Sequence, residues 1–227
     1  SYARLGETRV ATAGHEKLRS YFDRIRLSGD RLMLLVNDLL DLSKFEAGQM
    51  ILNLGPVQLN ELVRDVIGEF ELLTQARGLR IVLEQSAHEL PICLIDAARI
   101  GQVVRNLLSN AVKFTPDGRA SHVRVETGTL PDGRPAVVIT VSDEGIGIPP
   151  DELQAVFDKF VQSSRTRTGA GGTGLGLAIC REIVEAHRGR IVARNNAAGG
   201  AEFIVELPSG LEPARALPAP VATGETG

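Results

Sequence analysis

The sequence has few cysteines, no long apolar run and no excess of basic residues, and each absence excludes a class of protein. Its two cysteines, Cys93 and Cys180, lie far apart without the spacing of metal ligands, so we expect reduced core thiols in a cytoplasmic protein. No apolar segment approaches the ~20 residues of a membrane-spanning helix, and no basic-then-apolar signal segment opens the chain. A net charge of −3 gives no reason to expect nucleic acid as a partner.

What is present begins with a long amphipathic pattern over residues 14–47, in a chain of 227 residues with 43% hydrophobic residues. Apolar residues recur there at steps of three, four and seven, which is the seam of a bundle or coiled-coil helix. The seam and its flank consist of Leu18, Phe22, Ile25, Leu32, Val36 and Leu39, with Tyr21, Leu35 and Leu42 beside them. A lone helix cannot bury such a stripe, so it needs a partner from the same chain or from a second copy.

The rest of the chain mixes helix and strand patterns without strict alternation, which favours an α+β fold: a long bundle helix followed by a two-layer α/β sandwich. We predict strands at 50–57, 79–84, 92–95, 122–127, 136–142, 191–194 and 201–207, and helices at 58–77, 96–114 and 173–187. This divides the chain into a partial helical region (1–48), a main domain (49–208) and a flexible Pro/Ala-rich tail or linker (209–227).

Three segments carry residue types suited to a nucleotide. In the first, Asn106, Asn110 and Lys113 lie at i, i+4 and i+7 of a predicted helix and so share one face. Amide oxygens suit Mg²⁺, which also takes phosphate oxygens, and the ammonium adds positive charge beside them. A solvated helix face explains the same pattern equally well when this segment is taken alone.

The second and third segments are rich in glycine. Asp143 ends a predicted strand and precedes Gly145 and Gly147, so a carboxylate able to accept from an exocyclic amine stands beside backbone that a ligand can approach closely. A tight strand-to-helix turn is the plain alternative. Residues 169–176 are mostly glycine or alanine and lead into an apolar helix, whose free N–H groups make a natural phosphate site. The preceding polar segment, 161–172, has the composition of a mobile lid.

Together these segments resemble the sequence boxes of sensor histidine kinases. Residues 106–114 are similar to the N box, 141–149 to the first glycine box, 157–160 to the Phe-x-x-Phe box and 169–176 to the second glycine box, in the family's order. Residues 37–48 resemble the end of the second helix of the family's dimerisation and phosphotransfer hairpin. The resemblance covers residues 14–207 and implies a Bergerat-type ATP-binding sandwich, shared with gyrase, heat-shock chaperones and mismatch-repair ATPases.

By this resemblance, ATP and Mg²⁺ are the cofactors and each box supplies ligands. Asn110 would be the Mg²⁺ ligand, with Asn106 supporting it and Lys113 meeting the phosphates, the last two as catalytic residues. Asp143 would hold the adenine amine, and Gly147 would shape the adenine pocket. The other implied cofactor-binding residues are Phe114, Gly145, Phe160, Arg165, Arg167, Gly172, Thr173, Gly174, Leu175 and Gly176.

The family's phospho-accepting histidine sits in a His-Glu-Leu-Arg-x-Pro-like motif, which this sequence lacks. The segment from His15 to Arg19 imitates that motif only superficially, because no Thr-Pro follows it. We therefore expect the acceptor upstream of Ser1, on a first hairpin helix that is mostly missing, and no self-phosphorylation by this chain alone.

The resemblance implies a protein-histidine kinase that passes the γ-phosphoryl of ATP to a histidine and then to an aspartate of a response-regulator receiver domain. It also implies a homodimer through the N-terminal helix, and a membrane reached only through an absent sensor region. A nucleotide-binding scaffold or pseudokinase stays open as the alternative. Hydrolytic ATPases of the superfamily have a water-activating Glu four residues before the metal-binding Asn; the amide of Asn106 stands there and cannot act as a base.

Overall fold

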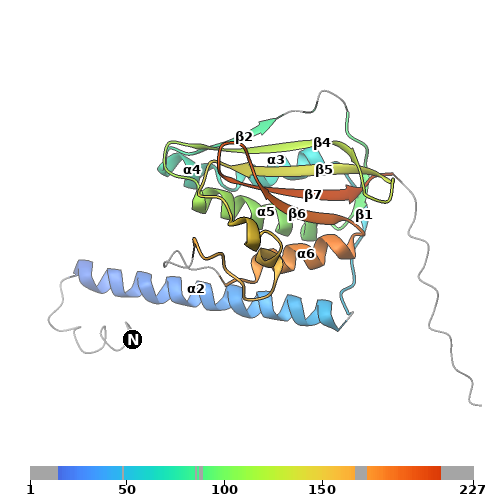
Figure 1. The fold of residues 1–227 in the computed structure, drawn as a ribbon. Coiled ribbons are helices and arrows are strands. Elements are labelled where there is room, and N and C mark those ends of the chain that lie inside the picture. Colours follow the sequence, from blue (N-terminus) through green and yellow to red (C-terminus); the bar gives the residue numbers. More distant parts are fainter. Residues whose placement is uncertain (1–14, 48, 85, 87–88, 167–172, 211–227) are drawn as a thin grey trace, which may run out of the picture.

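The computed structural model of the chain describes residues 15–47, 49–84, 86, 89–166 and 173–210. A long helix, α2 (His15–Glu46), runs beside an α/β sandwich, and Figure 1 shows it beyond α6, on the side away from the sheet. The helix predicted over 14–47 and the α+β fold are both confirmed. Within the described ranges, no helix is both long enough and apolar enough to cross a membrane.

The main sheet has five strands in the order β2-β4-β5-β7-β6, with β2 and β4 parallel and the other pairs antiparallel. The strands are β2 (Arg80–Glu84), β4 (Ala120–Thr129), β5 (Pro135–Asp143), β6 (Arg190–Asn195) and β7 (Ala201–Pro208). A separate antiparallel pair joins β1 (Gly55–Val57) to β3 (Cys93–Ile95). The register places the end of β5 beside the start of β7, so Asp143 lies next to the turn between β6 and β7.

Helices α3 (Leu59–Gly68), α5 (Ala97–Phe114) and α6 (Gly176–Ala186) form the second layer and bury their apolar faces in one core with the sheet. Two 3₁₀ turns, Pro150–Glu152 and Ala155–Phe157, follow β5. Asp96 begins α5 as predicted, since its carboxylate accepts a hydrogen bond from the backbone N–H of Arg99 at 3.1 Å. This cap fixes where α5 starts and therefore which of its side chains face away from the core.

The single helix predicted over 58–77 is wrong, because the structure has α3 followed by a separate α4 (Glu71–Ala76). The N–H groups of Glu69 and Phe70 bond back by three residues, to Val66 and Ile67, which tightens the chain into a turn. Phe70 then packs against the core, and Gly68 is a weak helix former at the break. The strand predicted over 50–57 is likewise shorter, since only Gly55–Val57 pairs with β3.

The C-terminal end of α2 packs on the sandwich of its own chain. Asp41 forms an ion pair with Arg99 of α5 at 2.8 Å and accepts a hydrogen bond from Gln102 at 3.2 Å. Leu42 is only 4% exposed and belongs to the core, whereas Phe22, earlier on the same stripe, is 67% exposed. The sandwich therefore covers only the last turns of the apolar stripe.

Candidate functional site

A cavity of about 780 Å³ lies where α5, the end of β5 and the start of α6 meet, with α2 along one side. Nine of the predicted site residues line it: Asn106, Asn110, Lys113, Phe114, Asp143, Gly147, Thr173, Gly174 and Gly176. These residues come from three separate sequence segments, so the fold gathers the predicted polar helix face and both glycine segments around one space.

The polar face of α5 forms one wall of the cavity. Asn106, Asn110 and Lys113 line it, while the apolar residues between them are buried in the core on the opposite face. The side-chain amide of Asn106 donates to the carbonyl of Gly176 at 3.3 Å, which ties α5 to the first residue of α6. The ammonium of Lys113 lies 4.9 Å from the ring centroid of Phe114. A positive charge and two amides thus share the same wall.

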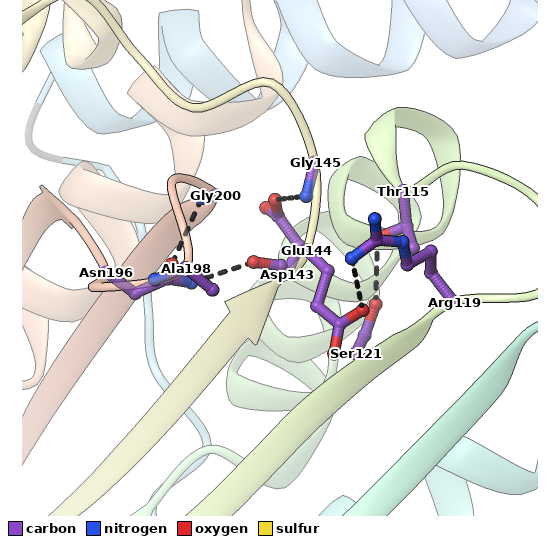
Figure 2. Close-up of polar contacts among 9 residues, drawn as sticks. All are labelled: Thr115, Arg119, Ser121, Asp143, Glu144, Gly145, Asn196, Ala198 and Gly200. Carbon is purple, nitrogen blue, oxygen red and sulfur yellow. Dashed lines mark hydrogen bonds and ion pairs between the residues drawn. The ribbon is translucent and has the colours of Figure 1, made fainter.

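Asp143 also lines the cavity and is only 4% exposed. Its Oδ1 accepts hydrogen bonds from the backbone N–H groups of Gly145 at 2.8 Å and Ala201 at 3.1 Å. Figure 2 shows the carboxylate between Gly145 and the β6–β7 turn. Burial raises the pKa of this carboxyl, and the two N–H bonds oppose that rise only in part. The group is a buried acceptor whose Oδ1 is already bonded.

The first glycine segment needs its glycines for steric reasons. Gly147 has φ 65°, and a Cβ there would lie 2.5 Å from the Gly199 carbonyl oxygen. A Cβ on Gly145 would lie 2.7 Å from the carbonyl oxygen of Phe114, although Gly145 does not itself line the cavity. Glu144, just before Gly145, does not line the cavity. Its carboxylate pairs with Arg119 at 3.4 Å (Figure 2).

The second glycine segment closes the cavity at the start of α6. Gly174 has φ 72° and approaches the backbone of Phe160, where a Cβ would lie 2.8 Å from the carbonyl carbon. The hydroxyl of Thr173 accepts from the N–H of Leu175 at 3.1 Å. The N-terminal end of an eleven-residue helix thus stands at the cavity, with the N–H groups and dipole direction that favour an anion.

Among the described residues, four predicted ligands lie off the cavity lining. Gly145 instead donates its backbone N–H to the Asp143 carboxylate, and Leu175 is buried in the core. Phe160 is 66% exposed, and its N–H donates to Gly174 at 2.9 Å. The guanidinium of Arg165 donates to the carbonyl of Ile146 at 2.6 Å, which links the segment after the 3₁₀ turns to the first glycine segment. The predicted ligands Arg167 and Gly172, and much of the predicted lid, lie outside the described residues.

Sequence reasoning did not assign several polar residues that line the cavity, which are Asp38, Ser109, Gln162, Ser163 and Thr166. Asp38 and Ser163 are the most informative of them. Asp38 of α2 lines the cavity and accepts a hydrogen bond from the Thr173 hydroxyl at 3.3 Å, while burial raises the pKa of its carboxyl. Ser163 also lines it, and its Oγ is buried without a hydrogen-bond partner among the described residues. Neither has a local signal, because each reaches the cavity only through the packing of its segment. An orphaned buried hydroxyl on a cavity wall fits a polar ligand.

The remaining wall is apolar, formed by side chains that include Ile146, Ile148, Val156, Leu177 and Phe203. Apolar side chains of this kind suit a flat heteroaromatic ring, and the buried carboxylate of Asp143 lies in the same cavity. In the described part of the chain, no cluster of three or more His, Cys, Asp or Glu side chains has the arrangement of a metal site. A divalent ion in this cavity would therefore depend on amide oxygens and on the ligand's own oxygens.

Comparison with known proteins agrees with this geometry. Residues 95–211 match the family model described as histidine kinase-, DNA gyrase B-, and HSP90-like ATPase. The chain is 40% identical over 179 residues to hybrid signal transduction histidine kinase D of Dictyostelium discoideum, covering 78% of this chain and 11% of the relative. It is 36% identical over 195 residues to circadian input-output histidine kinase CikA of Synechococcus elongatus, covering 85% of this chain and 25% of the relative.

Solved structures give the same picture. Full-length ShkA in complex with AMPPNP is similar with a TM-score of 0.70 and 31% identity, covering 92% of this chain and 45% of that one. Histidine kinase ThkA in complex with response regulator protein TrrA is similar with a TM-score of 0.70 and 26% identity, covering 92% of this chain and 56% of that one. The chain therefore spans a small part of its curated relatives and about half of these structures.

Proposed function

We propose, from the premise that this chain belongs to the family of histidine kinase-, DNA gyrase B- and HSP90-like ATPases, that it is the ATP-binding catalytic part of a sensor histidine kinase. The carrying observation is that one cavity brings together the amides of α5, a buried carboxylate and the glycine-bounded start of α6. The names of its relatives, which are histidine kinases, support this choice over a scaffold that only binds nucleotide.

At the apolar end of the cavity, Asp143 accepts a hydrogen bond from the exocyclic amine of adenine. Its Oδ1 already takes two backbone N–H groups, so Oδ2 serves the base. The apolar side chains around it, among them Ile148 and Phe203, exclude water from the ring. Because the carboxylate is buried, this hydrogen bond forms without competition from bulk solvent.

At the polar end, the phosphates lie between Lys113 and the start of α6. Asn110 would hold Mg²⁺, and Asn106, one turn earlier on α5, would support it, since both side chains line the cavity. The ion, when bound, neutralises charge on the phosphate oxygens during transfer. Lys113 contributes a further positive charge, and Asn106 is kept in place by its bond to Gly176. The amide of Asn106 cannot act as a general base and so cannot activate water. This favours transfer of the phosphoryl group to a protein side chain over hydrolysis.

Two partners follow from this proposal. The first is a response-regulator receiver domain, as supported by the similar structure of ThkA with TrrA. The second is another copy of this chain, bound through α2. Its seam residues Phe22, Leu32 and Leu39 are exposed in a single chain, and each Leu or Phe moved out of water contributes about 1.5–3 kcal/mol.

Calorimetric titration of the purified chain with ATP, with and without Mg²⁺, tests the proposal. Asn110→Ala should reduce the gain in affinity that Mg²⁺ provides while leaving Mg²⁺-free binding within about twofold, because the amide serves the metal. Asn60→Ala, an asparagine on α3 outside the cavity lining, is the matched control. A folded wild-type chain that takes up no ATP at millimolar concentration would refute the proposed function.

A further inference from the structure

The turn between β6 and β7 lies directly on the loop that follows Asp143. A Cβ on Gly200 would overlap the Asp143 carbonyl oxygen, and one on Gly147 would lie 2.5 Å from the Gly199 carbonyl oxygen. Backbone therefore touches backbone at both ends of residues 143–148, with no space for a side chain between them. Strands β6 and β7 pair as an antiparallel hairpin, and this turn connects them. A hairpin connection alone does not require the two asparagines, Asn195 and Asn196, at its start.

Asn196 connects the turn to the end of β5. Its side-chain nitrogen donates to the carbonyl of Asp143 at 2.7 Å and to the hydroxyl of Ser142 at 2.8 Å. Its side-chain oxygen accepts from the N–H groups of Ala198 and Gly200, both at 3.0 Å. Figure 2 shows Asn196 and the turn on one side of Asp143, with Gly145 on the other. The Asn196 amide thus bonds to the turn through its oxygen and to the backbone that carries the carboxylate through its nitrogen.

Asn195 holds the far end of the same loop. Its side-chain oxygen accepts from the N–H of Ile148 at 2.8 Å, and its side-chain nitrogen donates to the carbonyl of Ile148 at 2.6 Å. This paired arrangement needs both a donor and an acceptor on one short side chain. An ionised aspartate has no donor, and alanine has neither. Consecutive amides therefore anchor the loop before its first glycine and after its last.

The turn is already closed by its own backbone, since the N–H of Asn196 donates to Gly200 at 2.9 Å and that of Gly199 donates to Asn196 at 3.1 Å. The Asn195 amide and the Asn196 side-chain nitrogen therefore bond outside the turn, to residues 142–148. The turn also supplies the N–H of Ala201 to Asp143 Oδ1 at 3.1 Å. Every contact that orients this carboxylate is made by the loop or by the turn that the two amides join.

We propose that Asn195 and Asn196 are positioning residues that aim the Asp143 carboxylate at the amine of adenine and so set the preference for adenine over six-oxo purines. This rests on the proposed function, in which the cavity binds ATP. A purine with an oxygen in place of the amine presents an acceptor to the Asp143 carboxylate, and the two repel. Discrimination depends on how firmly the carboxylate is held, because a loosened group turns aside and accepts water between itself and the base.

The experiment measures the affinities of ATP and inosine triphosphate for the wild type, Asn195→Ala and Asn196→Ala. Both ligands carry the same triphosphate and differ at the six-position. We expect either variant to bind ATP about tenfold more weakly, the effect of one charge-assisted hydrogen bond, and inosine triphosphate less than about threefold more weakly. Arg194→Ala, on the same strand but paired with Glu202 outside the cavity lining, is the control and should keep the wild-type ratio.

A purely structural role would lower both affinities together and leave their ratio unchanged, and that result would overturn the proposal. Unchanged affinities for both ligands would overturn it as well. If Asn196→Ala does not fold, Asn195→Ala decides the question, since it leaves the bonds to Asp143 and Ser142 in place. Failure of the proposed function is distinct, because the wild-type chain would then bind neither nucleotide.

Discussion

Asp143 is buried and is proposed to bind adenine, so its protonation state should affect nucleotide affinity. Burial raises the pKa of the carboxyl above its ordinary value. Nucleotide affinity should therefore fall as pH decreases through that raised pKa, because the protonated group no longer accepts as an anion. Asp143→Asn should bind ATP at least about tenfold more weakly at neutral pH and should lose this step in the pH profile.

Calorimetry across a pH series checks this prediction. The profile of Asp143→Asn provides the baseline for titration of the phosphates themselves. Asp132→Asn, in the exposed turn between β4 and β5, serves as the control and should keep the wild-type profile. Identical profiles for the wild type and Asp143→Asn would show that the carboxylate does not contact the base.

The site residues that the sequence reveals are those within local motifs. Asn110 and Asp143 are visible because helical spacing and a strand end place them by local rules. Asn195 and Asn196 are not, since their task depends on the β5–β7 register that brings the turn to the loop. Consecutive asparagines before a glycine pair are the local hint, but asparagine is so common in turns that the pair does not by itself indicate this task.

At the scale of elements, the polar contacts that hold α2 to the sandwich include the partly buried ion pair between Asp41 and Arg99. Asp41→Ala should release the last turns of α2, since a hydrogen bond to a charged, partly buried group contributes about 1.5–3 kcal/mol. Amide hydrogen exchange at residues 39–46 should become about tenfold faster or more. Asp30→Ala removes only an exposed pair on the same helix and should leave this exchange unchanged.

The uncovered part of the stripe leads to a prediction about assembly. Leu32 and Leu39 are both more than half exposed in the single chain. We expect dimers at high micromolar concentration, and monomers after Leu32→Glu with Leu39→Glu, because a charge cannot be buried in the seam. Sedimentation across a concentration series measures this, with Leu72→Glu on α4 as an exposed control. A wild-type chain that stays monomeric would contradict the prediction.

Helical periodicity predicts where α2 lies but not what covers it. The stripe is uniform in sequence, yet Leu42 is buried by the sandwich and Phe22 is exposed. The covered end is the one where the sandwich reaches α2, through the packing of Leu42 in the core and the contact of Asp41 with Arg99 across 58 residues. The break between α3 and α4 escaped prediction for a similar reason, because the packing of Phe70 on the core overrides a continuous amphipathic pattern.

For the whole molecule, His187 connects the end of α6 to the start of α5. Its Nε2 accepts from the N–H of Asp96 at 2.9 Å, so its Nδ1 donates to the carbonyl of Ile183 at 2.7 Å. Burial lowers the pKa of His187 below its ordinary 6.5, despite the Ile183 carbonyl and the Asp96 charge. The neutral ring is the folded form, because a protonated Nε2 would face another donor.

The free energy of unfolding should therefore decrease as pH falls below about 6.5, the ordinary histidine value, toward the lowered pKa of His187. His187→Gln should be less stable at neutral pH, since a buried bond is disturbed, but should show a flatter decline in this window. Thermal unfolding at a series of pH values checks both statements.

Because Asp38 accepts a hydrogen bond from Thr173, its carboxylate on α2 competes for that hydroxyl with any anion bound in the cavity. The carboxylate occupies the hydroxyl at the start of α6, and a tethered group competes at an effective concentration of about millimolar whatever the concentration of protein. A ligand that bonds to the Thr173 hydroxyl must displace the Asp38 carboxylate, and the Asp38–Thr173 bond must weaken that ligand by the same factor. A shift of α2 by a fraction of a turn would then be felt as a change in nucleotide occupancy, with no change in the residues that hold the nucleotide.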